Sequence, residues 1–196
     1  MRSALPGNIS ESLDIKHFKD RFVVLHGDVS IQPDTLMFCT GYEYSFPFLE
    51  NSELVQTCKQ HVLPLFKHVM HLHQDTLFFM GIPRQYCPFP QFNGEAQFIV
   101  AKLRNVWSTP CPGTMIEDLS RDLQLRFGMG WCRRHAHVMR QLQWSYNQQL
   151  ATLGQFQPIP KPIQELYDFN SNYRDEQLCL YKQSNYKLVN GKYVLV

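Results

Sequence analysis

The histidines are the first residues of this chain whose spacing suggests chemistry. Two pairs, His71 with His73 and His135 with His137, are each separated by one residue. Alternate residues of a strand share a face, so on a strand each pair would be able to chelate a metal. His135 and His137 lie in a helical pattern, where a two-residue step turns the rings about 200° apart, and no Asp or Glu has a helpful spacing near either pair. The sequence therefore favours surface or boundary histidines and predicts no metal site.

The six cysteines, at positions 39, 58, 87, 111, 132 and 179, are widely spaced and form no CxxC motif. Such sparse cysteines indicate neither a disulfide-stapled scaffold nor a zinc ribbon, so we interpret them as reduced thiols that pack as small apolar groups. Any of them could pair with a histidine as a nucleophile, but nothing local favours one. Cys39 lies within an apolar strand pattern, where a thiol is expected to be inert.

Two segments that contain glycine are candidates for cofactor binding. Gly128-Met129-Gly130 has no strand before it and no third glycine at the right step, since Arg133 stands there, so we interpret it as a turn after a helix. Thr40-Gly41-Tyr42 follows a predicted buried strand, and ligands of open α/β sheets bind beyond the carboxyl ends of strands. Glycine at that point lets a backbone approach a flat cofactor closely. Taken alone, the pattern still favours a simple strand-end turn.

The strands that would position Thr40-Gly41-Tyr42 predict an α/β fold. Residues 22–31 have the pattern of a small hairpin, and Leu36–Thr40 and Leu77–Gly81 are nearly continuous apolar runs bounded by turn residues. Runs that are apolar on both faces are typical of parallel strands covered by helices. We therefore expect these two runs to lie in one parallel sheet, with a short helix over residues 52–59 between them.

The second half of the chain has a helical pattern. Apolar residues recur at three- and four-residue steps from Phe92 to Val106. Thr114 and Glu117 form a capping-box pattern, which predicts a helix that runs to about Phe127. The other predicted elements are a helix over residues 134–153 closed by Gly154, a short helix over 163–167, and weak strands over 178–181 and 193–196.

The composition is that of a protein with a buried core. Of 196 residues, 44% are apolar and only 18% are charged, which argues against wholesale disorder. A formal charge of +2 without a basic run gives no support for nucleic-acid binding. No stretch reaches the roughly 18 apolar residues that a transmembrane helix needs, and the first 15 residues lack the apolar core of a secretory signal. From these observations we expect a cytoplasmic protein.

The segment Asp34–Leu49, DTLMFCTGYEYSFPFL, resembles the carboxyl-terminal signature of flavin-containing monooxygenases. That family carries Asp, an apolar strand, Phe-(Ala/Cys)-Thr-Gly-Tyr and a nearby Phe-Pro-Phe. Further stretches agree in the same order, and the last of them resembles insect-type members: residues 64–68 (PLFKH), 76–83, 87–90 (CPFP) and 134–139. The resemblance extends over nearly the whole chain.

The resemblance implies that this chain is less than half of a family member. The glycine-rich loops that hold FAD and NADPH in the family are absent from the sequence, so we expect a carboxyl-terminal fragment or a truncated paralogue. Residues 1–33 would be a remnant of the crossing from the NADPH domain, with a small hairpin. Residues 34–157 would be the carboxyl-terminal part of a Rossmann-like FAD domain with its parallel sheet, and residues 158–196 a tail.

The function that the resemblance implies is NADPH- and FAD-dependent transfer of one atom of molecular oxygen to nitrogen or sulfur in a small molecule. Thr40, Gly41 and Tyr42 would contact the cofactor, and no catalytic acid or base is expected. Where the family usually has Gln-Ala-Arg, this chain has Glu95-Ala96-Gln97, so Glu95 and Gln97 are further candidate cofactor contacts. The alternative is an inactive remnant or interaction module. Without a glycine-rich loop for the FAD pyrophosphate, the chain by itself is expected not to bind FAD tightly.

Overall fold

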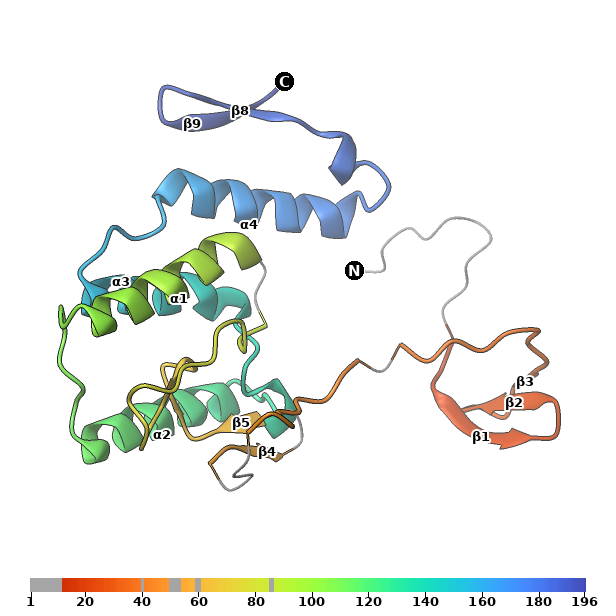
Figure 1. Ribbon diagram of the computed structural model, residues 1–196. Coiled ribbons are helices and arrows are strands. Elements are labelled where there is room, and N and C mark those ends of the chain that lie inside the picture. Colours follow the sequence, from red (N-terminus) through yellow and green to blue (C-terminus); the bar gives the residue numbers. More distant parts are fainter. Residues whose placement is uncertain (1–11, 40, 50–53, 59–60, 85–86) are drawn as a thin grey trace. The chain divides into compact units, whose positions relative to one another are not determined.

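The computed structural model describes residues 12–39, 41–49, 54–58, 61–84 and 87–196 (Figure 1). The chain divides into two compact units. The first unit comprises the residues up to Tyr42 together with Tyr173–Lys182, and the second comprises Glu43–Asn172 with Gln183–Val196. The domain boundaries expected after residues 33 and 157 stay a prediction.

The first unit contains a three-stranded antiparallel sheet of β1 (Ile15–Lys19), β2 (Phe22–Leu25) and β3 (Ser30–Ile31). The central strand β2 pairs with both neighbours, and its residues 23–25 are buried. Gly27 allows the turn between β2 and β3 because its φ of +92° is strained for any residue with a side chain. The hairpin predicted over residues 22–31 is thereby confirmed.

The second unit begins with two short antiparallel pairs. β4 (Gln56–Cys58) pairs with β5 (His61–Leu63), and β6 (Leu65–Phe66) pairs with β7 (Met70–His71). Val62 and Leu65 of these strands are buried with Phe79 and Ile82 in one apolar cluster. Helices of the unit pack against these short strands.

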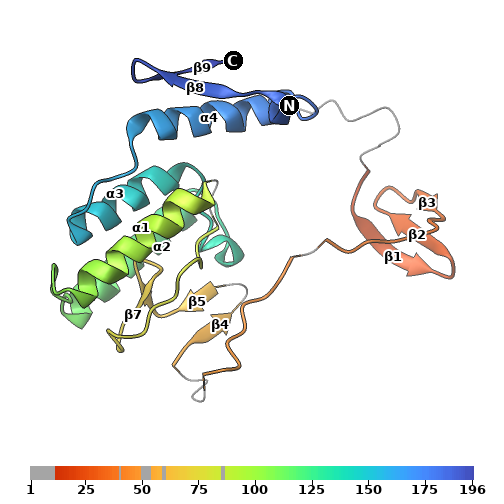
Figure 2. The same cartoon turned by 45° about the horizontal axis from the view of Figure 1, so that its top comes forward.

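Four α-helices and a terminal hairpin complete the chain. α1 packs along α3, as both Figure 1 and Figure 2 show, and α2 contacts β6. The larger core cluster joins these helices to the β6–β7 pair through Phe66, Met70, Phe98, Met139 and Leu150. The elements are α1 (Pro88–Leu103), α2 (Pro112–Gly128), α3 (Gln143–Gly154), α4 (Lys161–Glu176), β8 (Tyr186–Val189) and β9 (Lys192–Leu195).

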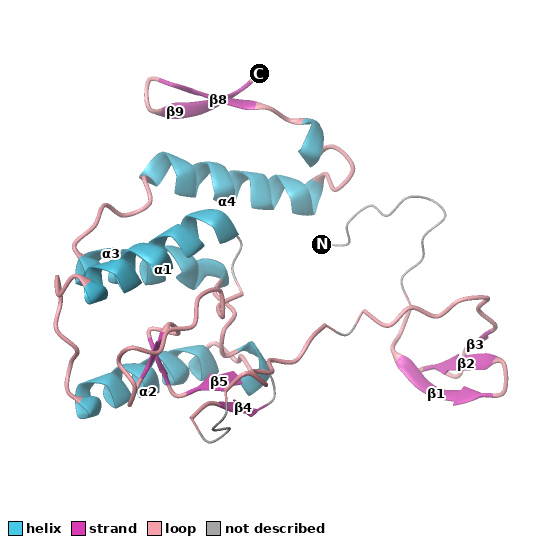
Figure 3. Cartoon of the chain, viewed as in Figure 1, coloured by secondary structure: helices cyan, strands magenta, loops and turns pink. Residues whose placement is uncertain are grey.

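The predicted parallel sheet is wrong. Residues 35–39 form no strand, and Met37 and Phe38 are 79% and 67% exposed, so the apolar run lacks a pairing partner among the described residues (Figure 3). Leu77–Phe79 instead pairs antiparallel with Val69–His71 through backbone hydrogen bonds. The short connection from His71 to Leu77 permits this, whereas a parallel pair needs a crossover of about a dozen residues or more. The fold is mixed α/β with small antiparallel sheets.

Several predicted element boundaries also need correction. The helix predicted from Phe92 begins at Pro88, and the helix predicted from Thr114 begins at Pro112, because proline is well suited to the first helical position. The helix predicted from Arg134 begins only at Gln143, since the backbone of His137 and Met139 bonds to Arg84 instead. Further corrections concern residues 56–58, which form β4 and not a helix, residues 161–176, which form one long helix, and residues 178–181, which form no strand.

The end of the third helix at Gly154 and the strand near the carboxyl terminus are confirmed. Gly128-Met129-Gly130 also has the predicted role, because Met129 caps α2 and Gly130 adopts a φ of +77°. No helix within the described ranges is long and apolar enough to cross a membrane.

Candidate functional site

A pocket of about 470 Å³ opens between α2, the start of α3 and the turn that joins β6 to β7. Its floor contains the buried side chains of His68, Arg126 and Tyr146, and its rim contains exposed residues such as Arg121 and Ser145. Leucines at positions 65, 119, 125 and 142 provide the apolar part of the wall. The pocket is thus apolar with several convergent charged groups, which is the usual character of a ligand site.

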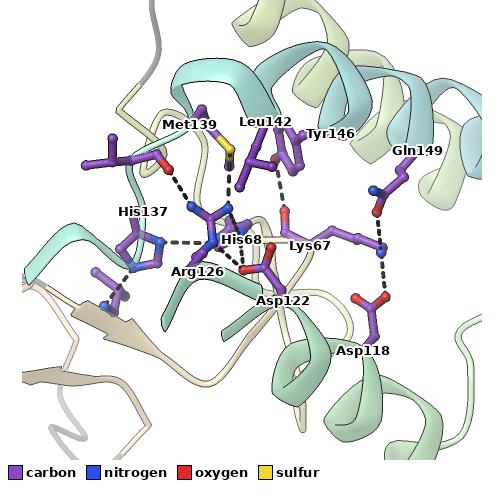
Figure 4. A network of polar contacts seen from close by, with 12 residues as sticks. Lys67, His68, Asp118, Asp122, Arg126, His137, Met139, Leu142, Tyr146 and Gln149 are labelled. Atoms are coloured by element: carbon purple, nitrogen blue, oxygen red, sulfur yellow. Dashed lines mark hydrogen bonds and ion pairs between the residues drawn. The ribbon is translucent and has the colours of Figure 1, made fainter. Parts of the chain in front are cut away.

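Lys67 spans one side of this pocket. Its ammonium donates to Asp118 Oδ1 at 2.6 Å and to Gln149 Oε1 at 2.8 Å, so it ties α2 to α3 (Figure 4). The Lys67 side chain is 13% exposed, and its carbonyl accepts a hydrogen bond from Tyr146 Oη at 2.9 Å. An ammonium has three N–H donors, so one remains for a further partner.

The hydrogen bonds of the buried histidines fix their tautomers. The Val62 amide donates to His137 Nε2 at 2.9 Å, and because an amide N–H cannot accept, the His137 proton must lie on Nδ1. That proton points to His68 Nδ1 at 2.9 Å, so His68 accepts there and carries its own proton on Nε2. His68 Nε2 lies 3.1 Å from Asp122 Oδ2. A chain of hydrogen bonds, here called the histidine relay, therefore runs from the Val62 amide through the neutral rings of His137 and His68 to Asp122.

Arg126 holds the other side of Asp122. It is 1% exposed, and its Nε donates to Asp122 Oδ2 at 2.6 Å, while Nη1 donates to the Val138 carbonyl and Nη2 to Met139 Sδ at 3.5 Å. Arg126 Nη2 also lies 3.3 Å from His68 Nε2. Because the relay makes both of these nitrogens donors, this last approach is a contact and not a hydrogen bond.

The charges of this network follow from its geometry. Burial acts to raise the pKa of Asp122, but the hydrogen-bonding and electrostatic interactions with His68, and then those with Arg126, outweigh it and hold that pKa well below its usual range. Burial lowers the pKa of His137 to about 2 and that of His61 to about 4. Asp122 is thus ionised and both rings are neutral at neutral pH.

The expectation of surface or boundary histidines is wrong for four of them. His61, His68, His71 and His137 are all buried, and for His68, His71 and His137 hydrogen bonds within the protein replace those to water. His73 is exposed. In the part of the chain that the structure describes, no group of three or more His, Cys, Asp or Glu side chains is arranged to hold a metal ion.

The cysteines whose side chains are described are free thiols. Cys87 is buried, and burial raises the pKa of its thiol. Cys39, expected to be inert inside a strand, is exposed because residues 35–39 form no strand. Cys111 is also exposed, and hydrogen bonds from Thr114 lower the pKa of its thiol.

The residues predicted to contact a cofactor are spread over both units. Thr40 lies outside the described residues. Gly41 has a φ of +85° and no neighbouring atom within 4 Å of the place where a Cβ would be, and Tyr42 is 91% exposed. Both belong to the first unit, whereas Glu95 and Gln97 lie on α1 in the second. Gln97 is half-buried.

Glu95 is fully buried, with 0% exposure. Its Oε2 accepts from the Gly81 amide at 2.7 Å and its Oε1 from Gln91 Nε2 at 2.9 Å, while Tyr146 Oη lies 3.4 Å from Oε1. Burial raises the pKa of Glu95, and its hydrogen bonds only partly oppose this. Its carboxyl therefore joins α1 to the segment at Gly81 and is not open to solvent.

Sequence reasoning missed the charged residues of the pocket. Asp118, Asp122 and Arg126 stand four residues apart within the predicted second helix, and this i, i+4 spacing places them on one face. That spacing was the available signal, together with Lys67 and His68 in the PLFKH segment. The partnership between the two segments depends on tertiary contacts and has no sequence signal of its own.

The known proteins to which this chain is similar agree with one another. The chain matches the family described as "Flavin-binding monooxygenase-like" over residues 2–159. Flavin-containing monooxygenase FMO GS-OX-like 2 from Arabidopsis thaliana is 32% identical over 167 residues, which cover 80% of this chain and 36% of that protein. This chain spans only about a third of the length of such curated relatives. These relatives are plant proteins, so they do not support the expected likeness to insect-type members.

Solved structures agree with this family. The structure of S-allyl-L-cysteine S-oxygenase from Allium sativum is 32% identical, with a TM-score of 0.77, and the match covers 86% of this chain and 39% of that one. The crystal structure of Tmm from Pelagibacter sp. strain HTCC7211 shares the fold with a TM-score of 0.79 at 18% identity, over 98% of this chain and 43% of that one. With the family match extending over most of its residues, this chain belongs to the flavin-binding monooxygenase-like family.

Proposed function

We propose that this chain forms the carboxyl-terminal part of an NADPH- and FAD-dependent monooxygenase that oxygenates sulfur or nitrogen in small molecules. The observation that carries the proposal is its likeness to the S-oxygenase from Allium sativum over 86% of the chain. Sulfur is accordingly the first acceptor atom to test. The proposal concerns a whole protein of which this chain supplies one part, because it spans 39% of that relative.

The cofactors supply the redox chemistry, since FAD takes electrons from NADPH and reacts with molecular oxygen. The chain's own contribution is contact with the flavin side. Gly41 supports this role because its backbone is bare and a flat ring can approach it, and Tyr42 offers an exposed aromatic face beside it. Thr40, Glu95 and Gln97 stay proposed contacts, and Glu95 has the least support because protein donors occupy both of its oxygens.

Recombination with a relative tests the proposal. The Allium sativum S-oxygenase would be divided where this chain's match begins, and its amino-terminal part would be co-expressed with residues 1–196 of this chain. We expect the purified pair to retain flavin absorbance and to oxidise S-allyl-L-cysteine at the expense of NADPH. The control is the same amino-terminal part co-expressed with its own carboxyl-terminal part.

Two further measurements separate the outcomes. If the control pair holds flavin and the hybrid does not, the proposal fails and the alternative of an interaction module without cofactor binding takes its place. Titration of residues 1–196 alone with FAD, followed by flavin fluorescence, should give no saturable binding at micromolar concentration. Missing pyrophosphate contacts are worth roughly 1.5 to 3 kcal/mol each, so binding of that strength would contradict the division of roles proposed here.

A further inference from the structure

We propose that the pocket between α2, α3 and the β6–β7 turn binds a small amphipathic carboxylate. The proposal does not depend on the function proposed above.

The wall of the pocket carries an excess positive charge. Its ionised side chains are three cations and two carboxylates, with His68 neutral. Lys67 is paired with Asp118, and Arg126 is paired with Asp122 at 2.6 Å. Arg121 forms no ion pair with any residue in the described ranges. The two carboxylates are thus already neutralised, and the unmatched charge favours an anion over a cation.

The free donors line the same pocket. Asp118, Arg121, Asp122 and Leu125 are spaced i, i+3, i+4 and i+7 on α2, so they share one face of the helix. The third N–H of Lys67 has no hydrogen-bond partner among the residues that the structure describes. The flexible Arg121 side chain on the rim provides a forked donor suited to a carboxylate.

The apolar wall defines the rest of the ligand. Leu119 and Leu125 of α2 face the pocket together with Leu142 at the start of α3. Leu125 is 50% exposed, so an apolar chain lying on it would remove surface from water. A volume of about 470 Å³ is enough for a short aliphatic or aromatic acid. The chemistry of the wall therefore indicates a carboxylate head with an apolar body.

Titration of the full chain with hexanoate tests this, with amide NMR shifts as the readout. We expect saturable shifts at residues 118–126 and 142–149, and weaker binding of acetate, which lacks the apolar body. Hexanamide and hexylamine have the same apolar chain without the negative charge, so they should bind at least about tenfold more weakly, as the loss of a charge-assisted hydrogen bond implies.

Two variants locate the contacts. Arg121→Gln should raise the Kd for hexanoate about tenfold, and Leu125→Gln should reduce hexanoate binding towards that of acetate. Both positions are exposed, so the fold should survive. Arg104→Gln, at an exposed arginine after α1, is the matched control and should leave the Kd unchanged. Equal binding of hexylamine, equal Kd values for the Arg121 and Arg104 variants, or no hexanoate shift at millimolar concentration would each overturn the proposal.

Discussion

Two carboxyl groups of the second unit, the partly buried Asp122 and the fully buried Glu95, have opposite surroundings. Asp122 on α2 is held by the Arg126 guanidinium and the neutral His68 ring, whereas Glu95 on α1 has only neutral donors from Gly81 and Gln91. The pKa of Asp122 is lowered and that of Glu95 is raised. Both lie in hydrogen-bonded clusters, so hydrogen bonding alone does not decide the charge. Asp122 is also 28% exposed whereas Glu95 is fully buried, so the difference teaches that a nearby cation together with partial exposure keeps one of the two carboxylates ionised.

Removal of the Arg126 cation should have the largest effect on the free energy of unfolding. Arg126→Met leaves the partly buried Asp122 without its ion-pair partner and the Val138 carbonyl without its donor. We expect unfolding free energy to fall by about 3 to 5 kcal/mol, measured by urea denaturation. Arg121→Met, at an exposed position of the same helix, is the control and should change it by no more than about 0.5 kcal/mol.

A double variant sharpens the comparison. Asp122→Leu with Arg126→Met removes both charges, so no unpaired ion is left in the core. The double variant should lose less stability than the sum of the two single variants, because the pair is coupled. Simple additivity would show that Arg126 stabilises the fold by packing and not through Asp122.

Interruption of the histidine relay should have the next largest effect on the free energy of unfolding. His137→Phe leaves the buried Val62 amide without an acceptor and His68 Nδ1 without a donor. An unsatisfied buried group costs about 1 to 3 kcal/mol, and hydrogen exchange at Val62 should accelerate. His137→Gln can still offer an acceptor oxygen and should recover part of the loss. Equal exchange rates in both variants and the parent would rule out the relay.

Substitution of Glu95 should raise the free energy of unfolding, whereas the substitutions above lower it. Because the folded-state pKa of Glu95 is raised, its stabilising contribution is complete below the unfolded pKa of about 4.3 and is lost as pH rises through the folded value. Glu95→Gln removes this loss, so the variant should be more stable than the parent at pH 8 and unchanged near pH 4. Rotation of the Gln91 amide, whose Oε1 has no partner among the described residues, lets it accept from the new amide.

Asp122→Asn provides the matched opposite case. The pKa of Asp122 is lowered in the folded state, so its contribution is complete above the unfolded pKa of about 3.9 and is lost as pH falls below that value. This variant should therefore be destabilised at pH 7 and somewhat less so near pH 3, because the contribution is lost completely only when the pH falls through the lowered folded-state pKa. Urea denaturation across this range compares the two, and equal signs at pH 7 for the Glu95 and Asp122 variants would contradict the role of the cation.

The sequence predicted local features better than long-range ones. The hairpin over residues 22–31, the end of a helix at Gly154 and the turn at Gly130 depend on glycine, apolar runs and short connections, and they are confirmed. The parallel sheet depended on a pairing between two distant apolar runs, and periodicity alone does not supply the partner. Local sequence patterns do not predict the pocket for the same reason, since His68 and Arg126 are in contact but lie 58 residues apart in the sequence.

The smallest effect near neutral pH should come from His61, a buried ring whose Nε2 has no hydrogen-bond partner in the described part of the chain. Its ring lies 5.0 Å from that of His137, and a phenyl ring can keep this packing. His61→Phe should therefore change unfolding free energy by less than about 0.5 kcal/mol at pH 7.5, since no satisfied hydrogen bond is lost.

Acid should reveal the difference between the parent and His61→Phe. Burial lowers the pKa of His61 to about 4, so the folded state keeps the ring neutral while the unfolded chain binds a proton below about pH 6.5. Its contribution is present above that pH and is lost as pH falls from about 6.5 towards 4. The variant should consequently be more stable than the parent by about 2 kcal/mol at pH 5, measured by urea denaturation. His17→Phe, at an exposed position of β1, controls for the added phenyl ring. An equal difference between parent and His61→Phe at both pH values would mean that the folded and unfolded chains bind the His61 proton equally well, and it would contradict a pKa lowered by burial.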